Sequence, residues 1–540
     1  MSDTTPQTGQ DLVDNLIHRV NVGDSLTRTA RRRPGNLAVV DGERRWTYAE
    51  LNAWVNRVAN ALDRDGYRRG DALALASGNS VEFLVVYYAC AKLGVVCVPV
   101  NLGWKAAEVA YVLGHSESRG IAVETQLFAA MAGAIRDTPG VRDVIVLPGL
   151  GGDTTADLGD VTPRTLDSIV DGAADTEPEK YVADRDPITY LYTSGTTSFP
   201  KGVVGNHTAI YLESAMMCLE AQFTSDDRFV AMMPMFHTAQ LNVHCTSAVM
   251  VGAAIWAERA FDAGRLLATI ESERITQIFG LPMMYRAMLD HPDMASRDLT
   301  SLRRALYAMA PMPEALITRC VEEFGCGFYL LFGQTEMSPA TTLFRPEHQL
   351  SHNGAAGTPV VNVEVAIMDG DGRLVPDGEQ GEIVYRGPQT MTEYLKNPEA
   401  TAEAFRHGWF HSGDVGRFDA DGLLWFTDRT KDVIKTGGEN VASIEVEKAI
   451  YAADPAVAEV VVVGLPHAHW SEAITAVVVP VAGSTIDPDA LIAKVKTLID
   501  PYKVPKAVIV LDALPKTSTG KIQKNVVREQ YVDHYGGLGG

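Results

Sequence analysis

Apolar and polar positions along the first quarter of the chain change period in a way that predicts alternating strands and helices. In WTYAELNAWVNRVANAL, residues 46–62, apolar residues recur at helical spacing after Thr47, whose hydroxyl suits a helix N-cap. The segments ALALASG, FLVVYYACAKLG, VVCVPVN and GIAVE are almost wholly apolar, which is typical of elements buried within a parallel sheet and its covering helices. The pattern therefore predicts consecutive βα units and an α/β architecture.

The middle of the chain contains two regions of different character. Residues 149–187 are rich in Gly, Asp and Thr and are expected to form surface loops before a strand at 188–192. Residues 361–386 contain short strands separated by turn dipeptides. This second region predicts a small antiparallel β unit.

The last hundred or so residues read as a separate compact body. After the segment DRTKD, a helix is expected at 443–453, with strands around 460–463 and at 473–480 and a further helix from Asp487 on. Such a set can form an α+β domain of its own. The pattern thus predicts two bodies joined at a hinge.

Composition narrows the functional classes. A chain of 540 residues is too long for a single hydrophobic core, so two or more domains are expected. Its 46% hydrophobic and 21% charged residues are typical of a globular protein. The net charge of −21 argues against nucleic acid as a partner, because phosphate backbones are bound by clustered Lys and Arg.

The cysteines and the apolar runs indicate a cytoplasmic protein. The six cysteines include no C-x-x-C pair, which favours reduced, buried thiols over disulfides or a zinc site. Residues 1–10 are polar and contain no apolar h-region, so a secretory signal is not expected. The longest apolar run, residues 83–100, is interrupted by Lys92, Gly94 and Pro99, so no integral membrane segment is expected. The oligomeric state is left open, and a homodimer is compatible with the sequence.

The most specific local signal is TSGTTSFPKG, residues 193–202, which follows an apolar strand. Backbone N–H groups, hydroxyls and one lysine in such a loop can hold a polyphosphate. The segment is not a Walker A motif, because Lys201 is followed by Gly202 rather than by Ser or Thr. Taken alone, a hydroxyl-rich hexapeptide is more often an ordinary turn.

The complete string resembles the phosphate-binding signature of the adenylate-forming superfamily, which contains acyl- and aryl-CoA ligases, luciferases and peptide-synthetase adenylation domains. Further motifs of that superfamily follow in its order from WTYAELN to PKTSTGK, so the resemblance covers nearly the whole chain and is closest to acyl-CoA synthetases. It implies an N-terminal domain, residues 1–428, of two doubly wound sheets and a small β-barrel-like unit. A hinge at 429–432 and a small mobile α+β domain at 433–540 would follow.

The resemblance implies an acid–thiol ligase that consumes ATP with Mg²⁺ and coenzyme A. A carboxylic acid would attack the α-phosphorus of ATP, expel pyrophosphate and form an acyl-AMP, and the acyl group would then pass to the thiol of coenzyme A. The first step brings two anions together, so it calls for a metal ion, a lysine and phosphate-binding dipoles.

Two motifs carry the rest of the implied nucleotide site. In FGQTE, Phe332 would stack on adenine, Thr335 would contact the α-phosphate and Glu336 would coordinate Mg²⁺, for which a carboxylate is a suitable hard ligand. In HSGDV, Asp414 would accept hydrogen bonds from the ribose, with Arg429 as a second contact. Alone, Thr335-Glu336 could cap a helix and Asp414 or Arg429 could form a surface ion pair. The implied nucleotide-binding residues are Thr193, Ser194, Gly195, Thr196, Thr197, Lys201, Phe332, Gly333, Gln334, Asp414 and Arg429, and the implied metal-binding residues are Thr193 and Glu336.

Lys521 in PKTSTGKI matches the lysine that bridges the substrate carboxylate and the α-phosphate during adenylation. Because coenzyme A needs the same space in the second step, the resemblance implies that the C-terminal domain rotates about Lys431. Its opposite face would present KTGGEN along a pantetheine tunnel, although a Gly-Gly turn is a compatible interpretation. The implied tunnel residues are Lys435, Gly437, Gly438 and Glu439, and the implied catalytic residues are Lys521, Thr335, Glu336 and His237.

The resemblance places the acyl pocket in the middle of the N-terminal domain. A histidine beside an apolar run is more often a core residue, but relatives use it to gate the acid pocket. Where relatives often have Gly-Gly-Ala-Pro, this chain has AMAP, and Met309 adds a flexible apolar side chain. The implied pocket residues are Phe236, His237, Pro282, Met283, Tyr307, Ala308, Met309, Ala310, Ser338 and Pro339.

No Lys, Arg, Asp or Glu occurs at the pocket positions, which favours an apolar acid. Fatty acids, aryl acids and bulky alicyclic or terpenoid acids all satisfy this, so a role in fatty acid or secondary metabolism is expected and the pathway itself is left open. One alternative is an enzyme that stops at acyl-AMP or delivers it to a carrier protein or a separate ligase. Another is a catalytically silent nucleotide-binding relative, against which the intact Lys521, Thr335 and Glu336 argue.

Overall fold

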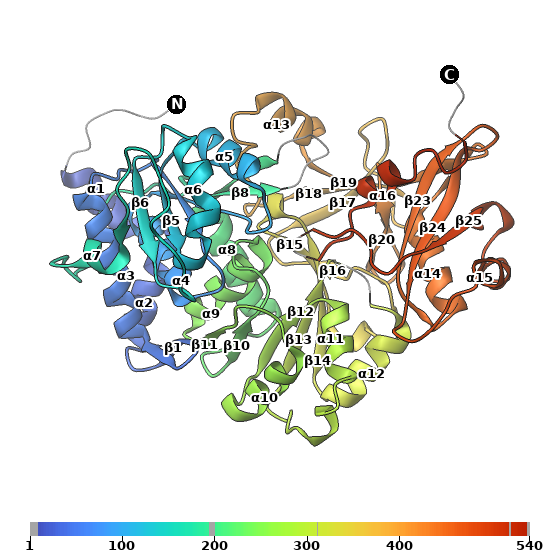
Figure 1. The fold of residues 1–540 in the computed structure, drawn as a ribbon, viewed down its shortest axis with the longest axis horizontal. Helices are drawn as coiled ribbons and strands as arrows, with labels where there is room; N and C mark the ends of the chain where they lie inside the picture. Colours follow the sequence, from blue (N-terminus) through green and yellow to red (C-terminus); the bar gives the residue numbers. More distant parts are fainter. Residues whose placement is uncertain (1–8, 194–199, 310–311, 518–519, 537–540) are drawn as a thin grey trace.

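The computed structural model describes residues 9–193, 200–309, 312–517 and 520–536. In Figure 1 the seven-stranded sheet that contains β5 and β6 lies at one end of the long axis, and the C-terminal sheet with β23, β24 and β25 lies at the other. A small antiparallel sheet, β17 to β20, lies between them. None of the helices in the described ranges is both long and apolar enough to cross a bilayer.

The seven-stranded sheet has the strand order β7-β6-β5-β3-β4-β8-β9. It is parallel except for the β8–β9 pair, which sets Thr193 opposite Lys201 at the end of the hairpin. The predicted βα units and the strand before the phosphate loop are therefore confirmed. Its strands are β3 (Ala72–Ala76), β4 (Val96–Pro99), β5 (Ser118–Glu124), β6 (Asp143–Leu147), β7 (Arg164–Thr165), β8 (Pro187–Thr193) and β9 (Lys201–Asn206).

The second large sheet has nine strands in the order β16-β15-β14-β13-β12-β10-β11-β1-β2. Its centre is parallel, and β2, β15 and β16 pair antiparallel at the two edges. Its strands are β1 (Leu37–Asp41), β2 (Arg44–Thr47), β10 (Arg228–Ala231), β11 (Ala254–Ala257), β12 (Gln277–Gly280), β13 (Arg304–Ala308), β14 (Gly327–Gly333), β15 (Ala340–Phe344) and β16 (Thr358–Pro359).

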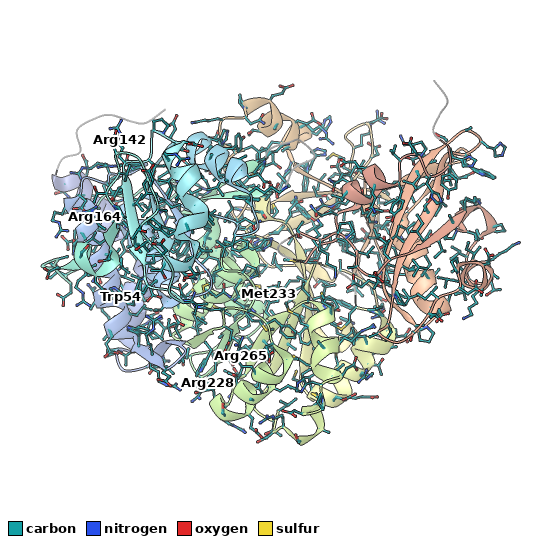
Figure 2. All side chains as sticks on the ribbon, in the orientation of Figure 1. Trp54, Arg142, Arg164, Arg228, Met233 and Arg265 are labelled. Atoms are coloured by element: carbon teal, nitrogen blue, oxygen red, sulfur yellow. The ribbon has the colours of Figure 1, made fainter. Side chains whose placement is uncertain are left out.

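Side-chain alternation along the strands produces the layers of the N-terminal domain. On β3, Ala74 packs into a core shared with α5 and α6, whereas Leu73 packs into the core that fills the space between the two large sheets. A third core covers the far side of the nine-stranded sheet with α10, α11 and α12. Figure 2 places Met233, which is 2% exposed, near the centre of the molecule and Arg142 and Arg164 toward its outer edge.

The helix predicted after Thr47 begins at the expected residue. Thr47 caps α3 with a full capping box, since its hydroxyl accepts from Glu50 N and the Glu50 carboxylate accepts from Thr47 N. The expected loop region 149–187 is interrupted by β7 and the short helix α7. The helices are α1 (Gly9–His18), α2 (Val22–Arg32), α3 (Tyr48–Arg64), α4 (Val81–Leu93), α5 (Ala106–His115), α6 (Phe128–Arg136), α7 (Leu166–Val170), α8 (His207–Glu220), α9 (Thr246–Val251), α10 (Ala263–Glu273), α11 (Pro282–Leu289), α12 (Glu314–Phe324) and α13 (Pro398–Ala404).

The small antiparallel unit is a four-stranded sheet in the order β17-β18-β19-β20, and its hydrogen bonding does not close into a ring. The C-terminal domain that follows has a five-stranded sheet, in which β23 and β24 form a long hairpin and β25 pairs parallel with β24. The remaining elements are β17 (Glu364–Met368), β18 (Gly381–Arg386), β19 (Phe410–Phe418), β20 (Leu424–Arg429), β21 (Ile434–Thr436), β22 (Glu439–Val441), α14 (Ser443–Ala453), β23 (Val457–His467), β24 (Ser471–Pro480), α15 (Pro488–Val495), β25 (Ala507–Val510) and α16 (Lys524–Gln530).

Candidate functional site

The two ends of the hydroxyl-rich loop are held together by the β8–β9 hairpin. Thr193 and Lys201 are register partners, so the two ends of the loop lie side by side on neighbouring strands. The Lys201 ammonium lies 5.0 Å from the centre of the Tyr394 ring, a cation–π contact. Among the predicted residues, Ser194, Gly195, Thr196 and Thr197 lie outside the described residues.

A sharp chain reversal after β14 presents the FGQTE motif. Gly333 has φ +154°, and a Cβ there would lie 1.9 Å from the Pro339 carbonyl oxygen, so only glycine fits this close approach. Gln334 N donates to the same oxygen at 3.0 Å and closes the loop. The Phe332 ring lies 5.4 Å from the Phe426 ring. The reversal thereby sets Thr335 and Glu336 at the end of the nine-stranded sheet.

Glu336 is bound on one side only. Its Oε1 accepts a hydrogen bond from Tyr394 Oη at 2.8 Å, and its Oε2 has no partner among the residues that the structure describes. Burial and the Glu336 charge raise the pKa of Tyr394, so its hydroxyl stays a donor. No group of three His, Cys, Asp or Glu residues suited to a metal occurs in the described ranges. One protein carboxylate fits Mg²⁺, which is usually held by one or two carboxylates together with substrate phosphates.

Asp414 and Arg429 face each other across the β19–β20 pair. Arg429 Nε lies 3.1 Å from Asp414 Oδ1, but no aligned hydrogen bond reaches that oxygen from any described residue. The side chain of Asp414 is buried, and burial raises its pKa against the opposing charges of Arg429 and Lys521. Asp414 therefore offers an open acceptor oxygen beside a cation, which suits a ribose hydroxyl.

Lys521 belongs to the C-terminal domain but lies against residues of the N-terminal domain. Gly520, with φ +84°, sits against Leu281: a Cβ on Gly520 would lie 2.8 Å from Leu281 Cδ1. The surrounding loop is closed by Thr517 N donating to Lys521 O at 2.8 Å. Part of the Lys521 side chain is exposed, yet loss of water around the ammonium and the nearby Arg429 lower its pKa to about 8. The structure thus brings the C-terminal lysine to the residues predicted to hold the nucleotide.

His237 is held as a neutral imidazole in the same place. Its Nδ1 accepts a hydrogen bond from Ala239 N at 3.3 Å, which leaves the proton on Nε2. Burial and the Lys521 charge lower its pKa to about 4. The residue precedes a π-helix, Ala239–Cys245, a form frequent at functional sites. The neutral His237 can therefore donate a hydrogen bond from Nε2 to another group in this site. A histidine with a purely structural role in the core would not need this free donor.

The predicted acyl pocket is only partly brought together. Because residues alternate along β13, Ala308 faces the core between the sheets, whereas Tyr307 packs on the other face and donates to Gln349 Oε1 at 2.7 Å. The Tyr307 side chain therefore lies on the opposite face of the sheet from Ala308, and its part in an acyl pocket stays a prediction. Met283, next to Pro282 on α11, is 49% exposed, and its neighbour Met284 packs against the core instead. Ala310 lies outside the described residues.

Phe236 and Met309 pack at the margin of the core between the sheets. Met309 has φ +71°, a conformation uncommon for a long side chain, and Ser338, beside Pro339, has φ +74°. The Ser338 hydroxyl donates to the Gln389 carbonyl oxygen at 2.9 Å, so it is already engaged. Of the predicted pocket residues, Phe236, Ala308 and Met309 are thus the apolar ones that pack in or against the core between the sheets.

The two predicted elements of domain movement are a short connection and a hairpin. Lys431 follows β20, and Asp432, on its other side, forms an ion pair with Arg528 at 2.8 Å. Gly437 and Gly438 have φ +60° and +89° and make the tight turn between β21 and β22, which confirms the turn interpretation. Among the described residues, the hydrogen bonds of this turn and of Lys435 and Glu439 stay within the C-terminal domain.

Tyr394 is a residue of this site that the sequence did not indicate. It links Glu336 and Lys201, which lie on two different sheets and far from it in the chain. Its segment, MTEYLKNPEAT, contains no hydroxyl-rich or glycine-rich pattern of its own. Only the three-dimensional contact identifies it.

The geometry of this site agrees with the protein family to which the chain is similar. The model of the AMP-binding enzyme family matches residues 26–395. The chain belongs to the AMP-binding enzyme family. A second model, the AMP-binding enzyme C-terminal domain, matches residues 445–521 and so includes Lys521. Membership confirms the resemblance to adenylate-forming enzymes.

Relatives of this AMP-binding enzyme cover nearly all of its length. A feruloyl-CoA synthase of Amycolatopsis sp is 37% identical over 94% of this chain and 99% of its own. The long-chain-fatty-acid–CoA ligase FadD13 of Mycobacterium tuberculosis is 36% identical over 95% of this chain and 98% of its own. The crystal structure of ATP-bound MatB from Rhodopseudomonas palustris superposes with a TM-score of 0.86 at 29% identity and covers 96% of this chain and all of that one.

These relationships settle the class of reaction. The AMP-binding enzyme is an ATP-dependent acyl-CoA synthetase, an AMP-forming acid–thiol ligase that uses Mg²⁺ and coenzyme A. Its fold, a large α/β N-terminal part followed by a small C-terminal domain, is the one expected. Its substrates are a carboxylic acid, ATP and coenzyme A.

Proposed function

We propose that this acyl-CoA synthetase acts on an apolar carboxylic acid, with aryl and fatty acids favoured over polar or amino acids. Phe236, Ala308 and Met309 are uncharged, and His237 is neutral at physiological pH because burial lowers its pKa to about 4. An uncharged, partly apolar lining disfavours a second charge on the acid. The relatives named for ferulate and for long-chain fatty acids support the same class.

The observation that carries the proposed chemistry is the docking of Lys521 beside Asp414 and His237. In the first step a carboxylate oxygen bonds to the α-phosphorus of ATP, and the bond to the β-phosphate oxygen breaks to release pyrophosphate. Lys521 bridges the two anions as they meet, and Thr335 contacts the α-phosphate. Asp414 and Arg429 orient the ribose, while Phe332 and Gln334 border the adenine.

Glu336 and Thr193 would hold the magnesium ion, which would supply positive charge to offset the negative charge of the phosphates. Lys201 and the segment after Thr193 bind the departing phosphates. In the second step the sulfur of coenzyme A bonds to the acyl carbonyl carbon and AMP leaves with the electron pair. For that step we propose that the domain at 433–540 turns about Lys431, within the hinge 429–432, and brings Lys435 and the Gly437-Gly438 turn with Glu439 to the pantetheine.

We place the enzyme in the cytoplasm, because all six of its cysteines are unpaired thiols, as expected in a reducing compartment. The decisive test is a panel of carboxylic acids assayed for ATP-dependent pyrophosphate release with and without coenzyme A. Ferulate and long-chain fatty acids should be turned over, and dicarboxylic and amino acids should not. Preference for a doubly charged acid would overturn the proposed class, and pyrophosphate release without acyl-CoA would favour an adenylate-only enzyme.

A further inference from the structure

A buried polar pair lies against the loop that carries Thr335 and Glu336. Its members are Glu213 on α8 and Gln389, which follows β18, and both side chains are 0% exposed. Neither residue has a part in the chemistry described above. Buried polar groups are almost always hydrogen-bonded, so the bonds of this pair can be accounted for atom by atom.

Gln389 holds the loop at three points. Its side-chain Nε2 donates to Met337 O at 2.8 Å and to Ala340 O at 2.6 Å. Its backbone carbonyl oxygen accepts from Ser338 Oγ at 2.9 Å. The reversed amide would set an oxygen against two carbonyl oxygens, so its orientation is determined. Both N–H groups are therefore used, and Oε1 has no donor among the described residues.

Glu213 completes the pair from α8. Its Oε1 accepts from Ala340 N at 3.3 Å, and its carboxyl group adjoins the Gln389 amide. Its Oε2 also has no donor within the described part of the chain. Because the remaining amide atom of Gln389 is an oxygen, an ionised Glu213 would leave two buried acceptors without a hydrogen. One proton on Glu213 Oε2, donated to Gln389 Oε1, satisfies both.

The electrostatic surroundings agree with that assignment. Burial raises the pKa of Glu213 well above its usual range, and no charged side chain contributes to the shift. A carboxylate in such a place would lack a counter-charge, which is the condition under which a buried acid keeps its proton.

We propose that Glu213 is a neutral carboxylic acid and a positioning residue that, through Gln389 and Ala340, fixes the segment 334–340 and hence the placement of Thr335 and Glu336. The inference rests on the proposed roles of those two residues. Glu213 acts only through the backbone of the segment. A displacement of about 1 Å at a reacting group costs on the order of 100-fold in rate, so this support matters for turnover.

The test compares two full-length variants. Glu213→Gln replaces the acid with an amide that can still donate to Gln389 and accept from Ala340, whereas Glu213→Leu fills a similar volume without hydrogen bonds. We expect Glu213→Gln to keep adenylation within about threefold of wild type and Glu213→Leu to lose on the order of 100-fold in kcat. Mn²⁺ affinity in the presence of a non-hydrolysable ATP analogue, read by electron paramagnetic resonance, should fall in Glu213→Leu alone.

A spectroscopic measurement checks the protonation state without turnover. The infrared difference spectrum of wild type against Glu213→Gln should contain the carbonyl stretch of a protonated carboxylic acid at neutral pH. A carboxylate band in its place, or equal losses in the two variants, would overturn the proposal. The infrared measurement does not use Glu213→Leu, so it remains valid even if that variant fails to fold.

Glu336→Gln separates this inference from the proposed metal site. If that variant keeps its Mn²⁺ affinity, the assignment of Glu336 is wrong and the inference falls with it. If Glu336→Gln loses Mn²⁺ affinity while folded Glu213→Leu keeps both affinity and rate, the metal site stands and only the role of Glu213 is refuted.

Discussion

Two lysines of this enzyme have a pKa lowered by desolvation, and they differ in how many hydrogen bonds their ammonium groups donate. Lys92, at the end of α4, is 2% exposed, and its ammonium donates to Asn52 Oδ1, Asn56 Oδ1 and Glu177 Oε2 at 2.6 to 2.7 Å. Lys521 has no hydrogen bond or ion pair from its ammonium to any described residue. All three N–H donors of Lys92 are bound by the protein itself, whereas those of Lys521 have no partner among the described residues.

The pKa shifts of the two lysines have the same direction and different meanings. Burial lowers the pKa of Lys92, while the Glu177 charge opposes the shift and holds the cation in place. Burial also lowers the pKa of Lys521, and the next cause, Arg429, lowers it further. Withdrawal from water alone therefore does not mark a functional lysine. A lowered pKa together with unused donors does.

The largest effect expected is that of Lys521→Ala. Removing the cation should lower acid-dependent pyrophosphate exchange by on the order of 10² to 10³, because an electrostatic contact to the developing transition state is lost. Thiolation of synthetic acyl-AMP should stay within a few-fold. The control is Lys516→Ala, which removes a lysine of the same loop that is paired with Glu459 at 2.6 Å. Equal loss of both half-reactions would remove the distinction drawn for Lys521.

The second prediction concerns delivery, since Lys521 reaches the site on a separate domain and Lys92 does not. Lys431→Pro fixes φ near −65° at the hinge, and the Lys431 N–H makes no hydrogen bond among those described. Adenylation should be spared and thiolation should fall by on the order of 100-fold, as measured in separate single-turnover assays. Normal overall turnover in this variant would place the hinge elsewhere.

A third prediction applies to the satisfied lysine. Lys92→Met keeps most of the side-chain volume but strips Glu177, Asn52 and Asn56 of a shared donor, so the free energy of unfolding should fall by about 2–3 kcal/mol. Denaturant midpoints measure the loss. The KM values for ATP and for the acid should stay unchanged in the folded enzyme, and a change in either would give Lys92 a functional part.

The pH dependence provides a fourth and graded test. Since its folded pKa is lowered to about 8, Lys521 is a cation below that pH and neutral above it. The kcat/KM of adenylation should therefore fall about tenfold per pH unit above pH 8, because this parameter reports groups of the free enzyme. Lys521→Arg, which stays charged, should abolish the decline even though its activity is lower. A flat wild-type profile would contradict the assignment.

The smallest effect expected is that of Tyr394→Phe. The ring beneath Lys201 is kept and the hydrogen bond to Glu336 is lost, which at about 1 kcal/mol should raise the Mg²⁺ concentration required by about fivefold. Tyr451→Phe is the matched control, because its hydroxyl accepts from Val460 N far from the metal site. The same increase in both variants would show a general rather than a local effect.

The sequence predicted those features that depend on local pattern. The capping box at Thr47, the buried α4 and the apolar β23–β24 hairpin follow from periodicity and side-chain chemistry. The nucleotide residues came from the resemblance, and the structure brings the described ones among them to one place.

The features that the sequence could not predict depend on which face of a sheet or helix a side chain occupies, and on contacts between segments that are distant in the chain. Tyr307 and Ala308 are neighbours in the chain, but strand alternation puts them on opposite faces of a sheet. Met283 and Met284 likewise differ in exposure because of helix phase. Glu213 and Tyr394 reach the segment 334–340 from distant parts of the chain, so no local pattern could indicate them.

A set of hydrogen bonds and an ion pair joins the residues before Lys431 to those after it, and it bears on the timing of the two proposed reaction steps. Asp428, upstream of Lys431, accepts from Ser443 N at 2.5 Å and from Ser443 Oγ at 2.6 Å, downstream of it. Lys524 contacts the same serine and pairs with Glu447 at 2.9 Å. In the domain rotation that we propose about Lys431, these contacts would open once and re-form once per turnover. The strength of these contacts would then set how long the C-terminal domain stays in the adenylation arrangement before coenzyme A can enter.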